Sequence, residues 1–137
     1  MQLKKLPIGI QTFSEIIEND YIYVDKTDIA YNLIDNYKYA FLSRPRRFGK
    51  SLFLDTLKNI FEAKKELFKG LAIEHKWDWN VSYPVIHINF ASGKIENRKD
   101  LDESIIRTLK QNQEHLKIEC EEKNSVAGCF VELIRKA

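Results

Sequence analysis

The chain has 137 residues, of which 44% are hydrophobic and 31% are charged, and its formal net charge is +2. Aromatic residues make up 12% of the sequence, which excludes a disordered chain, because disordered segments lack the apolar surface needed to offset chain entropy. The net charge is too small to indicate nucleic-acid binding by itself, so such a function would need a local basic cluster.

The cysteines and the N-terminal residues bear on the cellular compartment. Cys120 and Cys129 are the only cysteines, and two thiols cannot make a disulfide framework. We expect both to be free thiols in a reducing compartment. Residues 1–7 lack the apolar region of a secretion signal, and no apolar run approaches the roughly 18 residues that span a bilayer. The sequence therefore predicts a cytoplasmic protein with no membrane partner.

Residues 1–38 are predicted to form a helical lead-in. The capping-box pattern Thr12-Phe13-Ser14-Glu15 opens a short helix that ends at Glu18. Residues 21–24 are rich in β-formers and read as a short extended segment. Asp25 or Thr27 can cap the next helix, which ends near Asn36.

Residues 39–137 are predicted to contain a strand, a loop and a helix in succession, followed by a second strand and further helices. The apolar run at residues 39–42 is consistent with a buried strand, and a loop covers residues 43–49. An amphipathic helix is predicted to start near Lys50, because apolar residues recur at helical spacing from Leu52 onwards. Gly70 lies where a left-handed residue would end a helical stretch.

Residues 84–90 give the clearest strand pattern, because β-branched residues alternate there behind a proline. A long helix is predicted over residues 98–123, and Asn124 or Ser125 can cap a last helix. Since helices and strands alternate, the predicted fold class is α/β, with a partial parallel sheet flanked by helices. Two strands are too few for a complete sheet of this type, so we expect a fragment.

The loop before the Lys50 helix fits a phosphate-binding motif. Its residues are Arg44, Pro45, Arg46, Arg47, Phe48, Gly49, Lys50 and Ser51, which match G-x-x-x-x-G-K-[ST] except that Arg44 replaces the first glycine. In such a loop, backbone N–H groups curl around phosphates at the positive end of a helix. Lys50 would reach the β- and γ-phosphates, Ser51 would hold Mg²⁺, and Gly49 would let the backbone approach closely. The motif predicts a binding site for ATP and Mg²⁺ that extends to Leu52.

Two other interpretations of the basic residues stay open. The loop could be a solvated basic turn with no ligand. It could also bind a nucleic-acid backbone, because Arg44, Arg46, Arg47 and Lys50 place four positive charges within seven residues. No second basic stripe or set of interleaved aromatics supports this alternative.

Several sequence blocks, in order, resemble the predicted AAA-ATPase-like family of bacteria and archaea. The blocks are Leu6-Pro7-Ile8-Gly9 with Phe13, Tyr23-Val24-Asp25-Lys26-Thr27, the motif from Arg44 to Leu52, Leu67-Phe68-Lys69-Gly70-Leu71-Ala72-Ile73, and Tyr83-Pro84-Val85-Ile86 leading into Asn89-Phe90. The Arg44–Ser51 block is highly specific, and the other blocks would be weak alone. In this family, arginine commonly occupies the position of the first glycine.

The resemblance implies a P-loop NTPase-like domain that binds ATP with Mg²⁺. Members of the family continue into a strand that ends in a Walker B acidic pair, and longer members carry a PD-(D/E)XK nuclease-like domain. No such strand follows Lys50, so the chain is expected to be truncated before the Walker B strand. We assign no catalytic residue in this chain, and we expect nucleotide binding with little or no hydrolysis. The implied partners are the missing part of the ATPase domain and the nuclease-like domain. The alternative function is that of a non-enzymatic, truncated interaction module that uses the ATPase scaffold and has no nucleotide affinity.

The block at Asp25, Lys26 and Thr27 has two interpretations. Its position ahead of the motif in the family suggests the adenine side of the site. Asp25 or Thr27 could equally be a helix cap, which is the interpretation that we favour.

Overall fold

The computed structural model describes residues 3–90, 94–122 and 125–137. The chain divides into two compact units, Met1–Tyr83 and Pro84–Ala137.

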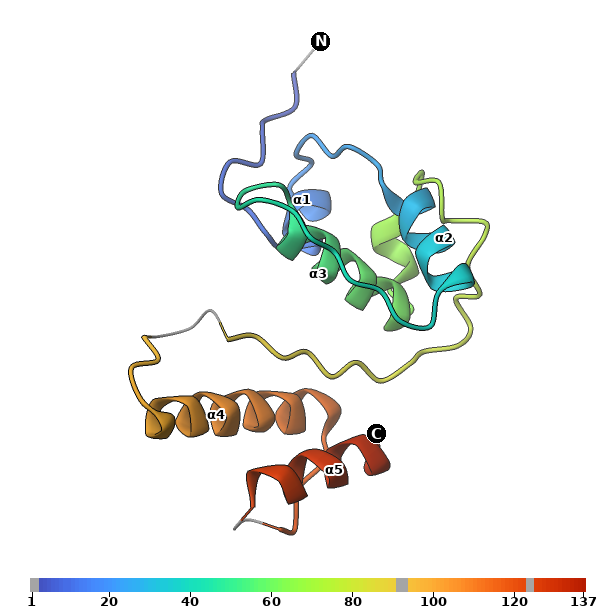
Figure 1. The fold of residues 1–137 in the computed structure, drawn as a ribbon. Helices are drawn as coiled ribbons and strands as arrows, with labels where there is room; N and C mark the ends of the chain where they lie inside the picture. The colour runs from blue at the N-terminus through green and yellow to red at the C-terminus, as the bar shows by residue number, and fades with distance from the viewer. Residues whose placement is uncertain (1–2, 91–93, 123–124) are drawn as a thin grey trace. The chain divides into compact units, whose positions relative to one another are not determined.

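The part of the chain that the structure describes contains five α-helices and one 3-10 helix and has no strand (Figure 1). The predicted α/β fold with a partial parallel sheet is therefore wrong. A strand needs a neighbour that exchanges backbone hydrogen bonds with it. Residues 39–42 and 84–90 have the expected apolar pattern, but they form no ladder among the residues that the structure describes, because the pattern says nothing about pairing. The predicted burial of residues 39–42 is also wrong, since Tyr39, Phe41 and Leu42 are exposed.

The first unit contains α1 (Phe13–Glu18), α2 (Thr27–Asn36), α3 (Lys50–Phe61) and the short 3-10 helix η1 (Lys65–Phe68). The predicted ends of the first two helices, Glu18 and Asn36, are confirmed, as is the predicted start at Lys50. Gly70 has φ +79°, so the predicted left-handed stop after η1 is also confirmed. Of the described helices, none is both long enough and apolar enough to cross a membrane.

Stacked aromatic rings form the centre of this unit. Phe13 and Phe68 are fully buried, and their ring centroids lie 4.8 Å apart. Phe68 also stacks on Trp79 at 5.0 Å. Each such pair contributes roughly 0.5–1.5 kcal/mol beyond the burial of its area. These contacts pack α1 against η1.

A hydrogen bond to α3 holds the start of α1. The backbone N–H of Phe13 donates to the carboxylate of Asp55 in α3 at 2.7 Å. Thr12 precedes the helix, but its side chain makes no capping hydrogen bond. The capping-box pattern therefore placed the helix correctly, whereas a carboxylate 42 residues away accepts the N–H group.

The second unit contains α4 (Arg98–Leu116) and α5 (Val126–Lys136). Asn97 and Asp100 form a capping box at the start of α4. The predicted continuation of this helix to Lys123 is wrong, because Lys117 adopts a left-handed conformation with φ 56°. Ser125 caps α5 by accepting a hydrogen bond from the Gly128 N–H, as predicted, and the alternative cap Asn124 lies outside the described residues.

The extended segment at the start of this unit is bound by a side chain instead of by a strand. Asn112 of α4 accepts a hydrogen bond from the His87 N–H and donates one to the His87 carbonyl, each at 2.8 Å. The amide of Asn112 thus satisfies the backbone groups that a neighbouring strand would satisfy in a sheet. Among the described residues, the backbone of His87 is therefore paired with a side chain and not with a ladder.

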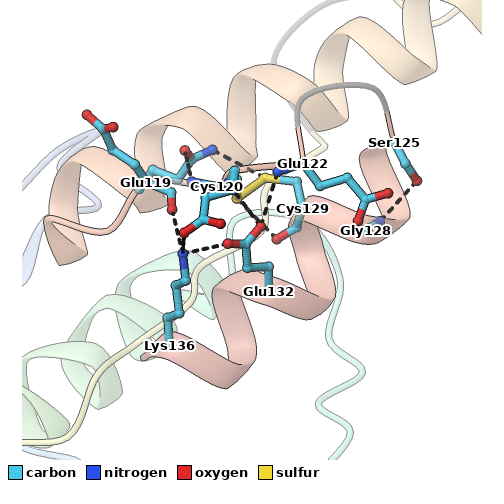
Figure 2. The surroundings of a disulfide bond; sticks show 10 residues. Glu119, Cys120, Glu122, Ser125, Gly128, Cys129, Glu132 and Lys136 are labelled. Carbon is cyan, nitrogen blue, oxygen red and sulfur yellow. Dashed lines mark hydrogen bonds and ion pairs between the residues drawn. A yellow bond between two sulfur atoms is a disulfide. The ribbon is translucent and has the colours of Figure 1, made fainter.

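A disulfide joins Cys120 to Cys129 across the turn between α4 and α5 (Figure 2). The expectation of free thiols is wrong. Spacing along the sequence could not reveal the pair, which has its Cα atoms 5.3 Å apart only because the chain reverses between the two helices. Since disulfides are typical of oxidising compartments, the cysteines no longer support the predicted cytoplasmic location.

The carboxylate of Glu132 holds the same turn. It accepts hydrogen bonds from the backbone N–H groups of Glu121 and Glu122 at 3.0 and 3.3 Å, and it pairs with Lys136 (Figure 2). The hydrogen bond from Lys136 is the main cause of the lowered pKa of Glu132. The turn is therefore bound to α5 both covalently and by a charged side chain.

We expect Cys129→Ser to destabilise the second unit by about 2–3 kcal/mol, because the disulfide closes a loop of about ten residues and so restricts the unfolded chain. Thermal unfolding of wild type and variant, followed by circular dichroism, measures this loss.

The double variant Cys120→Ser/Cys129→Ser is the control, because its unfolding should not change when a dithiol reductant is added. A wild-type chain that unfolds identically with and without reductant, and that has two titratable thiols when native, would contradict the disulfide.

Candidate functional site

The basic loop, defined as residues 44–51, leads into the first turn of α3. Arg47 and Gly49 have positive φ angles of 67° and 75°. Glycine adopts this conformation at little cost, whereas in a residue with a side chain it costs roughly 1–2 kcal/mol. Left-handed residues within a turn direct neighbouring N–H groups to one side and create a concave anion-binding surface. Strained backbone of the kind found at Arg47 is concentrated at functional sites in proteins.

The side chain of Lys50 folds back over the start of the basic loop. Its ammonium donates to the backbone carbonyls of Arg44 and Pro45, at 2.5 and 3.0 Å. These bonds hold the loop curled while the cation stays at the surface.

The first N–H groups of α3 are available to a ligand. No side chain of the described residues caps the helix at Gly49, and the first intrahelical bond runs from the Phe53 N–H to the Gly49 carbonyl. The N–H groups before Phe53 have no acceptor within the helix, as at every helix start. Together with the helix dipole they favour an anion at this end.

One cavity of about 820 Å³, here named the Lys50 cavity, opens beside the basic loop. Two segments far apart in sequence line it. They are residues 7–11 (Pro7, Ile8, Gly9, Ile10 and Gln11) and part of the predicted site (Arg46, Arg47, Gly49, Lys50, Ser51 and Leu52). Most of the predicted nucleotide-binding residues therefore share one cavity.

A second cavity, of about 490 Å³, also borders the basic loop and is here named the apolar cavity. Arg44 and Phe48, both predicted as site residues, line this cavity and not the Lys50 cavity. Phe48 is 66% exposed and Phe41 is 94% exposed. Gly49, Leu52 and Pro7 border both cavities.

Asp25 and Thr27 bind a segment that borders neither cavity. The Asp25 carboxylate accepts from the backbone N–H and the hydroxyl of Thr27, at 2.8 and 2.7 Å, and from the Ala72 N–H at 2.7 Å. The Thr27 hydroxyl accepts from the Ile73 N–H at 3.2 Å. The N-cap residue of α2 is Lys26, and no side chain makes a capping hydrogen bond there, so the predicted cap by Asp25 or Thr27 is not confirmed. Asp25 and Thr27 instead tie the start of α2 to residues 72 and 73. Lys26 lies apart from Lys50, on the lining of the apolar cavity.

Burial raises the pKa of Asp25, but the hydrogen bonds from Thr27 and Ala72 outweigh burial, so the pKa lies below its ordinary value. The charged form of Asp25 therefore stabilises the folded state.

Residues 7–11 and Asp55 were not predicted as site residues. The block Leu6-Pro7-Ile8-Gly9 supported the family resemblance, but no functional role was predicted for it. Its Pro-x-Gly spacing indicates only a turn. Nothing in the sequence indicates that this turn faces residues 46–52. Asp55 has no local signal either, because its partner Phe13 is 42 residues away.

A metal ion at this site would have to be held largely by the bound ligand and not by protein side chains. No group of three or more His, Cys, Asp or Glu side chains in the described ranges could hold a metal ion. Ser51 is exposed at the start of α3 and lines the Lys50 cavity.

Comparison with known proteins identifies the family. The family model described as "Predicted AAA-ATPase" matches residues 7–137, so the chain belongs to this family. The match includes the basic loop and both walls of the Lys50 cavity.

A curated relative is the "Uncharacterized protein in vnfD 5'region" of Azotobacter chroococcum mcd 1, which is 50% identical over 138 residues. The match covers 100% of this chain and 27% of the relative, so the chain spans about a quarter of the relative's length. No solved structure matches the chain.

We expect Asp25→Asn to destabilise the first unit by about 1 kcal/mol at pH 7, because the neutral amide accepts the Thr27 and Ala72 hydrogen bonds less strongly. The contribution of Asp25 is present above its unfolded pKa and is lost as the pH falls through its lower folded pKa. The difference in Tm between wild type and variant should therefore shrink on acidification below about pH 4.

Thermal unfolding from pH 7 to pH 2 measures this difference. Asp35→Asn is the control, because it removes an exposed carboxylate from α2, the helix that follows Asp25. A difference between wild type and Asp25→Asn that grew on acidification would contradict the assigned role.

Proposed function

We propose that this chain binds ATP, as a complex with Mg²⁺, through the basic loop. The observation that carries the proposal is the Lys50 ammonium bonded to the carbonyls of Arg44 and Pro45, at the uncapped start of α3. Membership of the predicted AAA-ATPase family supports a nucleotide as the ligand. Left-handed backbone at Arg47 and Gly49 supports an anion as the part that is bound.

Each residue of the loop would have a separate role. Backbone N–H groups from Arg46 to Ser51 would donate to phosphate oxygens, and Pro45 has no N–H to offer. Lys50 would exchange its two carbonyl acceptors for β- and γ-phosphate oxygens, and Ser51 would supply a hydroxyl ligand to Mg²⁺. The metal would offset the charge of the phosphates.

We further propose that binding occurs with little or no hydrolysis. Hydrolysis requires a group that orients the attacking water, commonly an acidic or amide side chain near the γ-phosphate. Of the described residues that line the Lys50 cavity, none is a carboxylate. The rest of an ATPase domain, and a nuclease-like domain of longer family members, are the partners that we propose for hydrolysis and its use.

We expect Lys50→Ala to weaken Mg·ATP binding about 10- to 100-fold, because a well-formed hydrogen bond to a charged group is worth about 1.5–3 kcal/mol. Isothermal titration of the 137-residue chain with Mg·ATP measures the change.

Lys58→Ala is the matched control. Lys58 lies on the same helix and pairs with Glu62 at 3.9 Å, but it borders neither cavity. The control variant loses one positive charge and should bind as wild type does. Equal binding by wild type and Lys50→Ala would rule out the proposed loop. DNA binding that weakens steeply with salt, in a chain with no affinity for ATP, would favour a nucleic-acid backbone as the ligand.

A further inference from the structure

The disulfide of the second unit has a cavity beside one of its two cysteines. Cys120 and Cys129 are both buried, with 7% and 9% of their surface exposed. Cys120 lines a cavity of about 500 Å³, here named the Cys120 cavity, and Cys129 does not line it. A reductant breaks a disulfide by attack on one sulfur, so the reaction depends on access to that sulfur. The cavity gives a small molecule a route to Cys120.

The lining of the Cys120 cavity is close to neutral. Besides Cys120 it consists of two lysines, two glutamates, one amide and one apolar residue: Lys110, Lys117, Glu114, Glu119, Gln113 and Ile118. The opposite charges offset one another, so the cavity does not select a charged reductant. Its volume lies within the range of about 300–1,000 Å³ that small-molecule sites occupy. A small, uncharged thiol compound therefore suits it.

The side chain of Gln113 contacts both halves of the disulfide. Its oxygen accepts a hydrogen bond from the Cys120 backbone N–H at 3.1 Å, and its nitrogen donates to the Cys129 Sγ at 3.4 Å. Since a backbone N–H can only donate, the amide oxygen must face Cys120, which turns the amide nitrogen toward the sulfur. Negative charge develops on the departing sulfur when a disulfide breaks, and a donor directed at that sulfur stabilises it. Gln113 therefore favours Cys129 as the leaving sulfur.

Other contacts would hold the two cysteines together after the bond breaks. The Glu132 carboxylate of α5 accepts from the N–H groups of Glu121 and Glu122, at 3.0 and 3.3 Å (Figure 2). Glu121 directly follows Cys120, and Glu132 shares α5 with Cys129, so these bonds join the same two segments as the disulfide. Two groups that are held close react far faster than separate molecules do. The reduced cysteines are thus placed to pair again.

We propose that Cys120 and Cys129 form a reversible redox site, at which a small dithiol attacks Cys120 and Cys129 is the leaving thiol. A thiolate of the dithiol bonds to the Cys120 sulfur, the S–S bond breaks, and its electron pair goes to the Cys129 sulfur, which takes a proton from water. The second thiolate of the dithiol then attacks the dithiol sulfur bonded to Cys120 and releases the Cys120 thiolate, which is also protonated. The dithiol becomes a cyclic disulfide, and its two electrons have passed to the cysteines. This inference does not depend on nucleotide binding.

The first test measures how the native protein is reduced. The oxidised 137-residue chain is treated with increasing concentrations of dithiothreitol, samples are quenched with acid and alkylated with N-ethylmaleimide, and mass spectrometry counts the free thiols. The rate should rise in proportion to the concentration of dithiothreitol. A rate independent of that concentration would overturn the proposal, because the bond would then be reached only after unfolding.

The second test identifies the sulfur that is attacked. 2-Mercaptoethanol has one thiol, so its adduct marks the attacked cysteine, and N-ethylmaleimide added after an early acid quench marks the leaving one. Peptide mapping should find the adduct on Cys120 and the maleimide on Cys129. An adduct mainly on Cys129, or equally on both cysteines, would overturn the assigned direction.

The third test removes the donor at the leaving sulfur. Gln113→Glu keeps an oxygen that accepts from the Cys120 N–H and replaces the donor at Cys129 by a charged oxygen. It should slow reduction by dithiothreitol about tenfold. Gln111→Glu is the matched control, because it makes the same change at an exposed position of α4 that does not line the Cys120 cavity. Equal rates for wild type and Gln113→Glu would refute the role of Gln113, and the first two tests use wild type alone.

The fourth test measures reversibility in mixtures of reduced and oxidised dithiothreitol. The reduced chain should keep its helical circular dichroism and should regain the disulfide within single chains. Glu132→Gln should shift the equilibrium about tenfold toward the thiols, because it weakens the bonds that hold the two segments together. Reoxidation that yields disulfide-linked dimers, or a reduced chain that has lost the helical signal, would show a structural disulfide and would overturn the reversible site.

Discussion

The hydrogen bond from the Phe13 backbone N–H to the Asp55 carboxylate is the constraint on which the candidate site depends. It joins the start of α1 to the middle of α3, next to the buried stack of Phe13 on Phe68. Because Phe13 lies two residues after Gln11, the same bond brings the turn at residues 7–11 to α3. The basic loop continues directly into the first turn of α3. The helix therefore positions both walls of the Lys50 cavity.

The basic loop concentrates positive charge where no side chain offsets it. Arg44, Arg46 and Arg47 are exposed, and no ion pair of the described residues includes them or Lys50. Lys50 bonds instead to neutral carbonyls of its own loop. Since charge-assisted bonds to an oxyanion are about twice as strong as bonds to neutral groups, an anionic ligand would improve every contact that the ammonium makes.

In the second unit, polar side chains form hydrogen bonds with backbone groups that regular secondary structure would otherwise pair. Asn112 satisfies the backbone of His87 in place of a strand, and Glu132 satisfies the N–H groups of Glu121 and Glu122 where the chain is not helical. The disulfide between Cys120 and Cys129 fixes the same turn covalently. These hydrogen bonds are partly buried, and polar side chains of α4 and α5 supply the partners that the backbone groups need.

Local sequence patterns were enough to predict the starts of α3 and α5, the left-handed stop at Gly70 and the composition of the basic loop. These features depend on apolar spacing, caps and glycine within a few residues. Long-range contacts, in contrast, explain why residues 39–42 and 84–90 pair with no strand in the described part of the chain, why Cys120 meets Cys129, and why residues 7–11 share a cavity with Lys50. Each of these depends on a partner that the local sequence does not specify: a neighbouring strand, a reversed chain or, for residues 7–11, the carboxylate of Asp55.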